Sequence, residues 1–205
     1  MRRARGAGAG LAGLALLLML PACMTVGQSP TVYYVLGDGS FASVRPVRAS
    51  GASRRLLVAP TEVESFYDTA SIAFSRKPGT RGYYQYAFWT ERPGQAFTRL
   101  LVARLETAGA FSSVALSTSG VDGELILNTT LTELYHDAAQ APGWARVRLT
   151  AELVDRRSRR LLARRTFDQA APAASYDAPG AVAGFERAIA ALLDELGRWA
   201  QEKAR

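Results

Sequence analysis

The sequence predicts an α+β fold in which a mostly antiparallel sheet is covered on one face by two helices. The first observation is a strict alternation over residues 145–153, where Ala, Val and Leu hold the odd positions and Arg, Thr and Glu the even ones. A period of two with one apolar side is typical of a half-buried antiparallel strand. The second observation is that apolar residues recur every three or four positions over 97–108 and 182–199, as on amphipathic helices.

The first half of the chain is predicted to supply four strands and one helix. Short β-branched or aromatic runs bounded by turn residues mark the strands at 33–36, 56–59, 71–76 and 83–89. The turn Lys77–Thr80 separates the last two, and residues 42–53 are predicted to be a loop. The helix over 97–108 ends at Gly109, a common residue after a helix C-terminus.

The second half is predicted to supply four more strands and the final helix. The strands fall at 111–116, 123–135, 145–153 and 161–167. In the second of them, Leu125, Leu127, Thr129 and Leu131 share one face. Asp177 lies at the predicted N-cap of the final helix, where a carboxylate can accept hydrogen bonds from free backbone N–H groups.

The N-terminal segment has the pattern of a bacterial lipoprotein signal. Three arginines among the first five residues precede an apolar run over 11–20, which is too short to span a bilayer. The run ends in Leu20-Pro21-Ala22-Cys23, which resembles a lipobox, and Cys23 is the only cysteine of the chain. In such lipoproteins the cysteine thiol receives diacylglycerol and its amine a further acyl chain such as palmitate. No other cofactor is predicted.

Length and charge are consistent with one exported domain. We predict a signal peptide at 1–22, a lipidated tether at 23–30 and a single periplasmic domain at 31–205. The three arginines of the signal leave with it, so the formal charge falls from +7 to +4. For an exported lipoprotein, this charge argues against a nucleic-acid partner and favours anionic lipid head groups.

The search for catalytic or metal-binding residues is negative. His136 is the only histidine; a Ser-His-Asp set with Asp137 or Asp122 is formally conceivable, but no G-x-S-x-G motif accompanies it. A lone histidine at a strand end is typical of a surface residue. Because metal sites need several clustered ligands, no metal site and no catalytic residue are predicted, and we expect the protein not to be an enzyme.

The segment 83–89 is a candidate partner-binding surface. It contains Tyr83, Tyr84, Tyr86 and Trp89, and tyrosine and tryptophan are the residue types that most often anchor protein interfaces. The alternative interpretation is that alternate side chains of this strand line the core while the others cover the sheet.

The hairpin over 146–165 is a candidate docking patch for anionic lipid or an acidic partner. It contains eight arginines, which are opposed within the hairpin only by Glu152 and Asp155. On its two predicted strands the candidates are Arg146, Arg148, Arg164 and Arg165. The alternative is an ordinary solvated strand face and turn.

These segments together resemble the ABC-type transport auxiliary lipoproteins, the PqiC-like family. The resemblance begins at Cys23 and at the strands 33–36 and 56–59, and continues through Tyr83-Tyr84 to Trp89. It then covers Leu100–Phe111, Val154–Ala163 and the final helix, and thus nearly the whole mature chain. One departure is Arg159, where the family often has glycine.

The resemblance implies an outer-membrane lipoprotein that faces the periplasm and works with an MCE-domain protein of a lipid transport system. Met24 agrees with that membrane, because lipoproteins retained in the inner membrane often have Asp after the cysteine. A ring-like homo-oligomer would suit docking onto a symmetric MCE tube. The competing hypothesis is a lipoprotein activator of a peptidoglycan synthase, although the short tether gives little reach through the cell wall.

Overall fold

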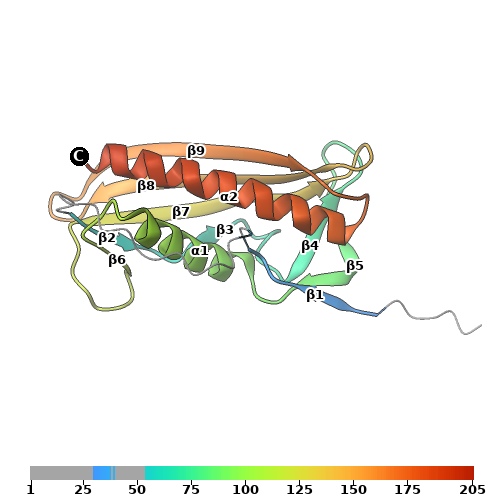
Figure 1. Ribbon diagram of the computed structural model, residues 1–205, viewed down its shortest axis with the longest axis horizontal. Helices are drawn as coiled ribbons and strands as arrows, with labels where there is room; N and C mark the ends of the chain where they lie inside the picture. Colours follow the sequence, from blue (N-terminus) through green and yellow to red (C-terminus); the bar gives the residue numbers. More distant parts are fainter. Residues whose placement is uncertain (1–29, 38, 40–53) are drawn as a thin grey trace, which may run out of the picture. The chain divides into compact units, whose positions relative to one another are not determined.

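The computed structural model describes residues 30–37, 39 and 54–205, and Thr31–Arg205 forms one compact unit (Figure 1). The predicted signal peptide, Cys23 and the loop predicted at 42–53 lie outside the described residues. The described part contains nine strands and two helices, in the order β1 (Val32–Tyr34), β2 (Arg55–Val58), β3 (Glu62–Val63), β4 (Ser71–Ser75), β5 (Gly82–Trp89), α1 (Pro93–Ala108), β6 (Ser113–Leu116), β7 (Leu125–Asp137), β8 (Trp144–Asp155), β9 (Arg160–Pro172) and α2 (Ala178–Lys203).

Strand β7 organises the sheet. On one edge it pairs antiparallel with β8 along its length, from Leu125 opposite Asp155 to Asp137 opposite Trp144, and β8 pairs in the same way with β9. On its other edge β7 pairs in parallel with three short strands in turn, β2, β3 and β4. Strand β6 extends the sheet beyond β2, and β5 followed by β1 extends it beyond β4. The sheet is therefore mixed, and its long ladders are antiparallel.

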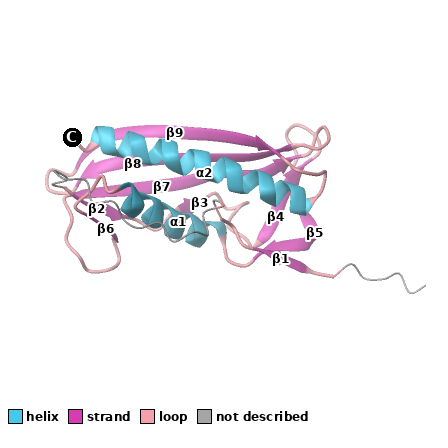
Figure 2. Ribbon diagram, in the orientation of Figure 1, coloured by secondary structure: helices cyan, strands magenta, loops and turns pink. Residues whose placement is uncertain are grey.

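Both helices lie on the same face of this sheet, which confirms the predicted fold class (Figure 2). Helix α2 packs on β8 and β9, and α1 packs on β2, β3 and β6 and against α2. The predicted stripe of α2 is fully buried; it comprises Val182, Phe185, Ile189, Leu192, Leu193, Leu196 and Trp199. The main core therefore lies between the two helices and the sheet.

The helix ends follow their local chemistry. The Asp177 carboxylate accepts a hydrogen bond from the Gly180 N–H at 2.9 Å, as the predicted cap requires. Gly109 ends α1 in the left-handed conformation, with φ of 62°. Helix α1 begins at Pro93, four residues before its predicted start. Proline is favoured in the first turn because it has no backbone N–H, and the N–H groups there have no acceptor within the helix.

The alternation predicted for β8 is confirmed, since its odd-numbered residues from 145 to 153 are buried. In β7 the face containing Leu125 and Leu131 is also buried as predicted. A bulge between Leu131 and Glu133 then shifts the alternation, so that Leu134 is again buried. Strand β3 was not predicted, because a strand of two residues is too short to show a period.

Candidate functional site

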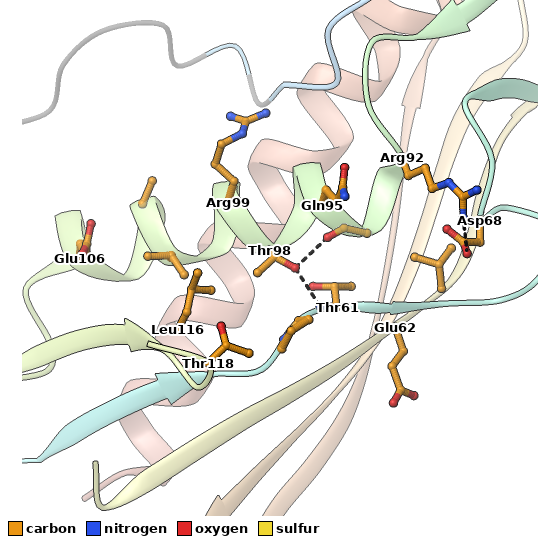
Figure 3. A pocket seen from close by; sticks show the side chains of 15 residues that line it. Thr61, Glu62, Asp68, Arg92, Gln95, Thr98, Arg99, Glu106, Leu116 and Thr118 are labelled. Carbon is orange, nitrogen blue, oxygen red and sulfur yellow. Dashed lines mark hydrogen bonds and ion pairs between the residues drawn. The ribbon is translucent and has the colours of Figure 1, made fainter. Parts of the chain in front are cut away.

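A groove runs along α1, between the helix and the segments that follow β2 and β6 (Figure 3). Its volume is about 970 Å³, large enough for a bound small molecule or a docked peptide segment. We call it the α1 groove. Its lining residues are Pro60, Thr61, Glu62, Val63, Asp68, Arg92, Gly94, Gln95, Thr98, Arg99, Val102, Ala103, Glu106, Leu116 and Thr118.

The floor of the α1 groove is fixed by hydrogen bonds between α1 and the segment after β2. The Thr98 hydroxyl accepts from the Thr61 N–H at 2.8 Å and donates to the Gly94 carbonyl at 2.7 Å. The Thr61 hydroxyl in turn bonds to Thr129 on β7 at 2.9 Å. Gly94 permits this approach, because a Cβ there would lie 2.8 Å from the Thr61 carbonyl oxygen. The groove is therefore preformed on a rigid base.

The walls of the α1 groove are largely aliphatic. Pro60 and Val63 contribute from the segment after β2, Val102 from α1, and Leu116 from the end of β6. Leu116 is one of the exposed large apolar side chains of the described residues. This apolar strip can bury hydrocarbon or an apolar side chain of a partner.

The rim of the α1 groove is charged and adaptable. Arg92 pairs with Asp68 at 3.3 Å, and Arg99 pairs with Glu91 at 2.6 Å. All four side chains are at least 30 % exposed, and exposed pairs of this kind contribute about 0–1 kcal/mol. They can therefore exchange partners at little cost. An apolar centre with a polar rim is the usual anatomy of a protein interface.

The four aromatic candidates of β5 have three different environments. Trp89 is only 2 % exposed and packs edge-on against Phe185 of α2 with ring centroids 5.6 Å apart, so the prediction of Trp89 as a surface anchor is wrong. Tyr83 and Tyr86 are exposed, and the Tyr83 ring stacks on Phe66. Tyr84 is half-buried and bonds to His136. The alternative interpretation, a strand that partly lines the core, therefore fits Trp89.

His136 is fully buried, which corrects the expectation of a surface residue. Its Nε2 lies 2.9 Å from the Pro142 carbonyl oxygen, which can only accept, so Nε2 carries the hydrogen. Nδ1 then accepts from the Tyr84 hydroxyl at 2.7 Å. Burial lowers the pKa of His136 and raises the pKa of Tyr84 to about 12, so both groups are neutral.

This arrangement uses both nitrogens of His136, so the ring is not placed as a general base. The two carboxylates considered as its partners are engaged elsewhere. Asp137 pairs with Arg146 at 2.8 Å, and Asp122 lies 3.9 Å from Arg156. In residues 30–37, 39 and 54–205, no cluster of three or more possible metal ligands is found.

The four predicted docking arginines are all ion-paired and lie on both faces of the sheet. Arg165 reaches Glu195 of α2 on the helix face. The other three lie on the opposite face, where Arg146 pairs with Asp137, Arg148 with Glu133 and Asp168, and Arg164 with Glu152. The hairpin strands therefore do not present a single unpaired basic surface.

Sequence reasoning missed the α1 groove. Its helical wall is built by Gln95, Thr98, Val102 and Glu106, which recur at helical spacing but mix polar and apolar types. The other wall comes from two segments that are far apart in the chain. A periodic pattern does not reveal such a site, because its shape depends on how those segments are brought together.

No helix among the described residues is both long and apolar enough to cross a membrane. Cys23 lies outside these residues, so its predicted lipidation stays a prediction.

Comparison with known proteins gives one family match. The family model described as "ABC-type transport auxiliary lipoprotein component" matches residues 34–197, most of the chain. No curated protein shows significant sequence similarity to the chain.

Solved structures show the same fold. The crystal structure of a Xanthomonas campestris protein of the family model DUF330 is 25 % identical with a TM-score of 0.74, over 85 % of this chain and 97 % of that one. An uncharacterized protein is 14 % identical with a TM-score of 0.64, over 83 % of this chain and 99 % of its own. The second likeness concerns the fold alone.

Proposed function

The chain belongs to the ABC-type transport auxiliary lipoprotein family, and on this premise we propose that it is a non-enzymatic lipoprotein that docks an MCE assembly at the outer membrane. The observation that carries the proposal is the family match over residues 34–197. The position of Cys23 directly after an apolar signal supports a covalent anchor, made of diacylglycerol and an N-acyl chain. Three acyl chains would exceed the two membrane signals that stable anchoring needs.

We place the docking of the MCE-domain protein at the α1 groove. The groove combines an aliphatic centre around Val102 and Leu116 with the weakly held charges of Arg92 and Arg99. A partner segment can bury apolar side chains in the centre and replace Asp68 or Glu91 at the rim. The rigid floor at Thr61 and Thr98 limits the conformational entropy lost on binding.

The docking is tested by photo-crosslinking in cells, with a crosslinking residue at Ala103 on the exposed side of α1. The matched control is Thr166, which is also exposed but lies with Thr150 on the helix-free face of the sheet. We expect an MCE-domain protein to be captured from position 103 and not from position 166. Capture from position 166 alone would move the interface to the other face. Capture of a peptidoglycan synthase from position 103 would instead support the competing activator function.

The anchor is tested separately. The variant Cys23→Ser should lose incorporation of labelled palmitate and should appear in the soluble periplasmic fraction, while the wild type is recovered with the outer membrane. Recovery of the unlabelled Cys23→Ser protein with the outer membrane would show that a protein contact, and not the acyl chains, holds the domain there.

A further inference from the structure

The exposed aromatic side chains of the described residues gather at one end of the sheet. They are Tyr33, Tyr83, Tyr86, Trp144 and Tyr176. These residues belong to β1, to β5, to the first position of β8 and to the segment just before α2. Figure 1 shows those elements at one end, whereas the turn between β8 and β9 and the C-terminus of α2 lie at the other. We call the five residues the aromatic end.

The aromatic end includes a surface without charge. Strands β1 and β5 contain no Asp, Glu, Lys or Arg, although 21 % of the whole chain is charged. Tyr33 is 64 % exposed, and its ring lies 5.8 Å from that of Phe88 on β5. Strand β1 is an outer strand of the sheet and pairs with β5. The surface is thus amphipathic and aromatic rather than ionic.

A basic turn lies beside this surface. Arg76, Lys77 and Arg81 occupy the connection between β4 and β5, and all three are exposed. Within the described part of the chain, none of them has an ion-pair partner. Arg76 instead lies over the Phe74 ring at 5.2 Å, and Arg81 lies over the Tyr135 ring at 3.7 Å. Arg81 is also held by hydrogen bonds to the Tyr67 hydroxyl and the Thr80 carbonyl, both at 2.9 Å, so Arg76 and Lys77 are the cations available to anionic groups from outside the protein.

The short chain length between the predicted anchor and β1 points to the bilayer as the surface that covers the aromatic end. Val32 follows Cys23 by nine residues, which span at most roughly 32 Å when fully extended. The turn at 156–159 lies a whole strand β8 away, roughly 40 Å at about 3.3 Å per residue. In a protein anchored at Cys23, the tether therefore keeps β1 within roughly 32 Å of the bilayer, whereas the turn at 156–159 can lie roughly 40 Å farther out.

We propose that the aromatic end rests on the bilayer, with its Tyr and Trp side chains at the level of the lipid head groups and the basic turn on lipid phosphates. Tyrosine and tryptophan are enriched at this depth because their rings are apolar and their polar atoms stay hydrated. Basic residues beside them gain from the negative surface potential of anionic lipids. This inference rests on the proposed lipid anchor, and it orients the domain with the 156–159 turn towards the periplasm.

The test uses the full-length acylated protein in vesicles of phosphatidylethanolamine and phosphatidylglycerol that contain brominated lipid, a quencher of tryptophan fluorescence. In a Trp144→Phe background, one variant has Tyr33→Trp and the matched control has Leu161→Trp, at a 53 % exposed position at the other end. The remaining tryptophans, Trp89 and Trp199, are both buried and common to the two proteins. We expect about twofold or more quenching for Tyr33→Trp relative to Leu161→Trp.

The outcomes separate this inference from the anchor itself. Protein that does not float with the vesicles means that the anchor has failed, and with it the proposed function. Protein that floats, but whose Tyr33→Trp signal is quenched no more than the Leu161→Trp signal, overturns the orientation. A blue-shifted Tyr33→Trp emission that depends on protein concentration and not on lipid would show that a second copy covers this end, which also overturns it.

The basic turn gives a second, independent measurement. In the Tyr33→Trp protein, Arg76→Gln with Lys77→Gln should reduce the extra quenching gained when phosphatidylglycerol is added. The matched control, Arg157→Gln with Arg160→Gln, removes two exposed arginines from the opposite end and should leave it unchanged. An equal loss in both proteins would show that net charge, and not the position of the basic turn, brings the domain to the lipid.

Discussion

Two regions of the sheet differ in whether their conspicuous side chains find partners within the fold. One is the aromatic pair of strands β1 and β5, and the other is the arginine-rich β8–β9 hairpin. The hairpin is rich in arginine, yet Glu133, Asp137 and Glu195, from outside the hairpin, neutralise several of these charges. Strands β1 and β5 contain no charged residue, and their exposed tyrosines stay exposed although Tyr83 stacks on Phe66 and Tyr33 lies beside Phe88. The comparison shows that a conspicuous composition is not by itself a free surface, because folding can supply partners from distant strands.

The largest expected effect is the difference in stability between truncating a buried and an exposed aromatic side chain of β5. Trp89→Ala should lower the free energy of unfolding by about 3–5 kcal/mol, because it removes a core ring packed on Phe185. Tyr86→Ala should change it by less than about 0.5 kcal/mol. Urea denaturation followed by circular dichroism measures both. Equal losses of unfolding free energy in the two variants would mean that Trp89 is not buried in the core while Tyr86 lies on the surface.

The second largest effect is expected at the buried polar pair beside β5. Tyr84→Phe removes the donor to His136 Nδ1 and leaves a buried acceptor unsatisfied, which should cost about 1–3 kcal/mol of stability at neutral pH. Tyr83→Phe is the matched control, since the Tyr83 hydroxyl donates to the Phe66 carbonyl on an exposed surface. The hydrogen-bond assignment fails if Tyr84→Phe is as stable as Tyr83→Phe.

The same pair predicts a pH dependence. Burial lowers the pKa of His136 in the folded state, so below its ordinary value of about 6.5 the unfolded chain binds a proton that the folded chain does not. Stability should therefore be complete above that pH and should fall as the pH drops from 7.5 to 5.5. His136→Leu should be less pH-dependent over this range. A wild-type protein that gains stability on acidification to pH 5.5 would contradict the buried neutral ring.

A smaller effect is expected in the hairpin turn. Arg159 has a positive φ of 55°, a conformation that costs a residue with a side chain about 1–2 kcal/mol and suits glycine. The glycine that the family resemblance leads us to expect at this position would adopt the conformation without that cost. Arg159→Gly should raise the thermal unfolding midpoint, with a gain of about 1 kcal/mol, while Arg157→Gly should not. A loss of stability in Arg159→Gly would indicate a contact of the arginine side chain that outweighs the strain.

The smallest effect is expected for the paired arginines. Arg146→Gln with Arg148→Gln should leave binding to vesicles containing phosphatidylglycerol unchanged within about twofold, because both side chains already pair with carboxylates. Flotation of the acylated protein cannot report this, so the measurement is the lipid quenching of Tyr33→Trp. A tenfold loss of this lipid quenching in the double variant would support the hairpin as a lipid-docking patch after all.

The sequence determined the features that depend on neighbours along the chain. The alternation of β8, the stripe of α2, the Asp177 cap and the Gly109 stop are all predictable, because each depends on residues within a few positions of one another. The family resemblance rests on the order and spacing of such short motifs, and together these features were sufficient for the fold class and for the transport-auxiliary family. The lipoprotein signal is also a local pattern, but it stays a prediction.

Only the tertiary structure decided which side chains are free. The burial of Trp89 and His136 and the pairing of Arg165 with Glu195 each depend on segments distant in the chain. The α1 groove likewise requires the segments after β2 and β6 to lie beside one helix. The physical reason is that burial and ion pairing are set by contacts across the fold, whereas a periodic pattern shows which face of an element is apolar but not what lies against it.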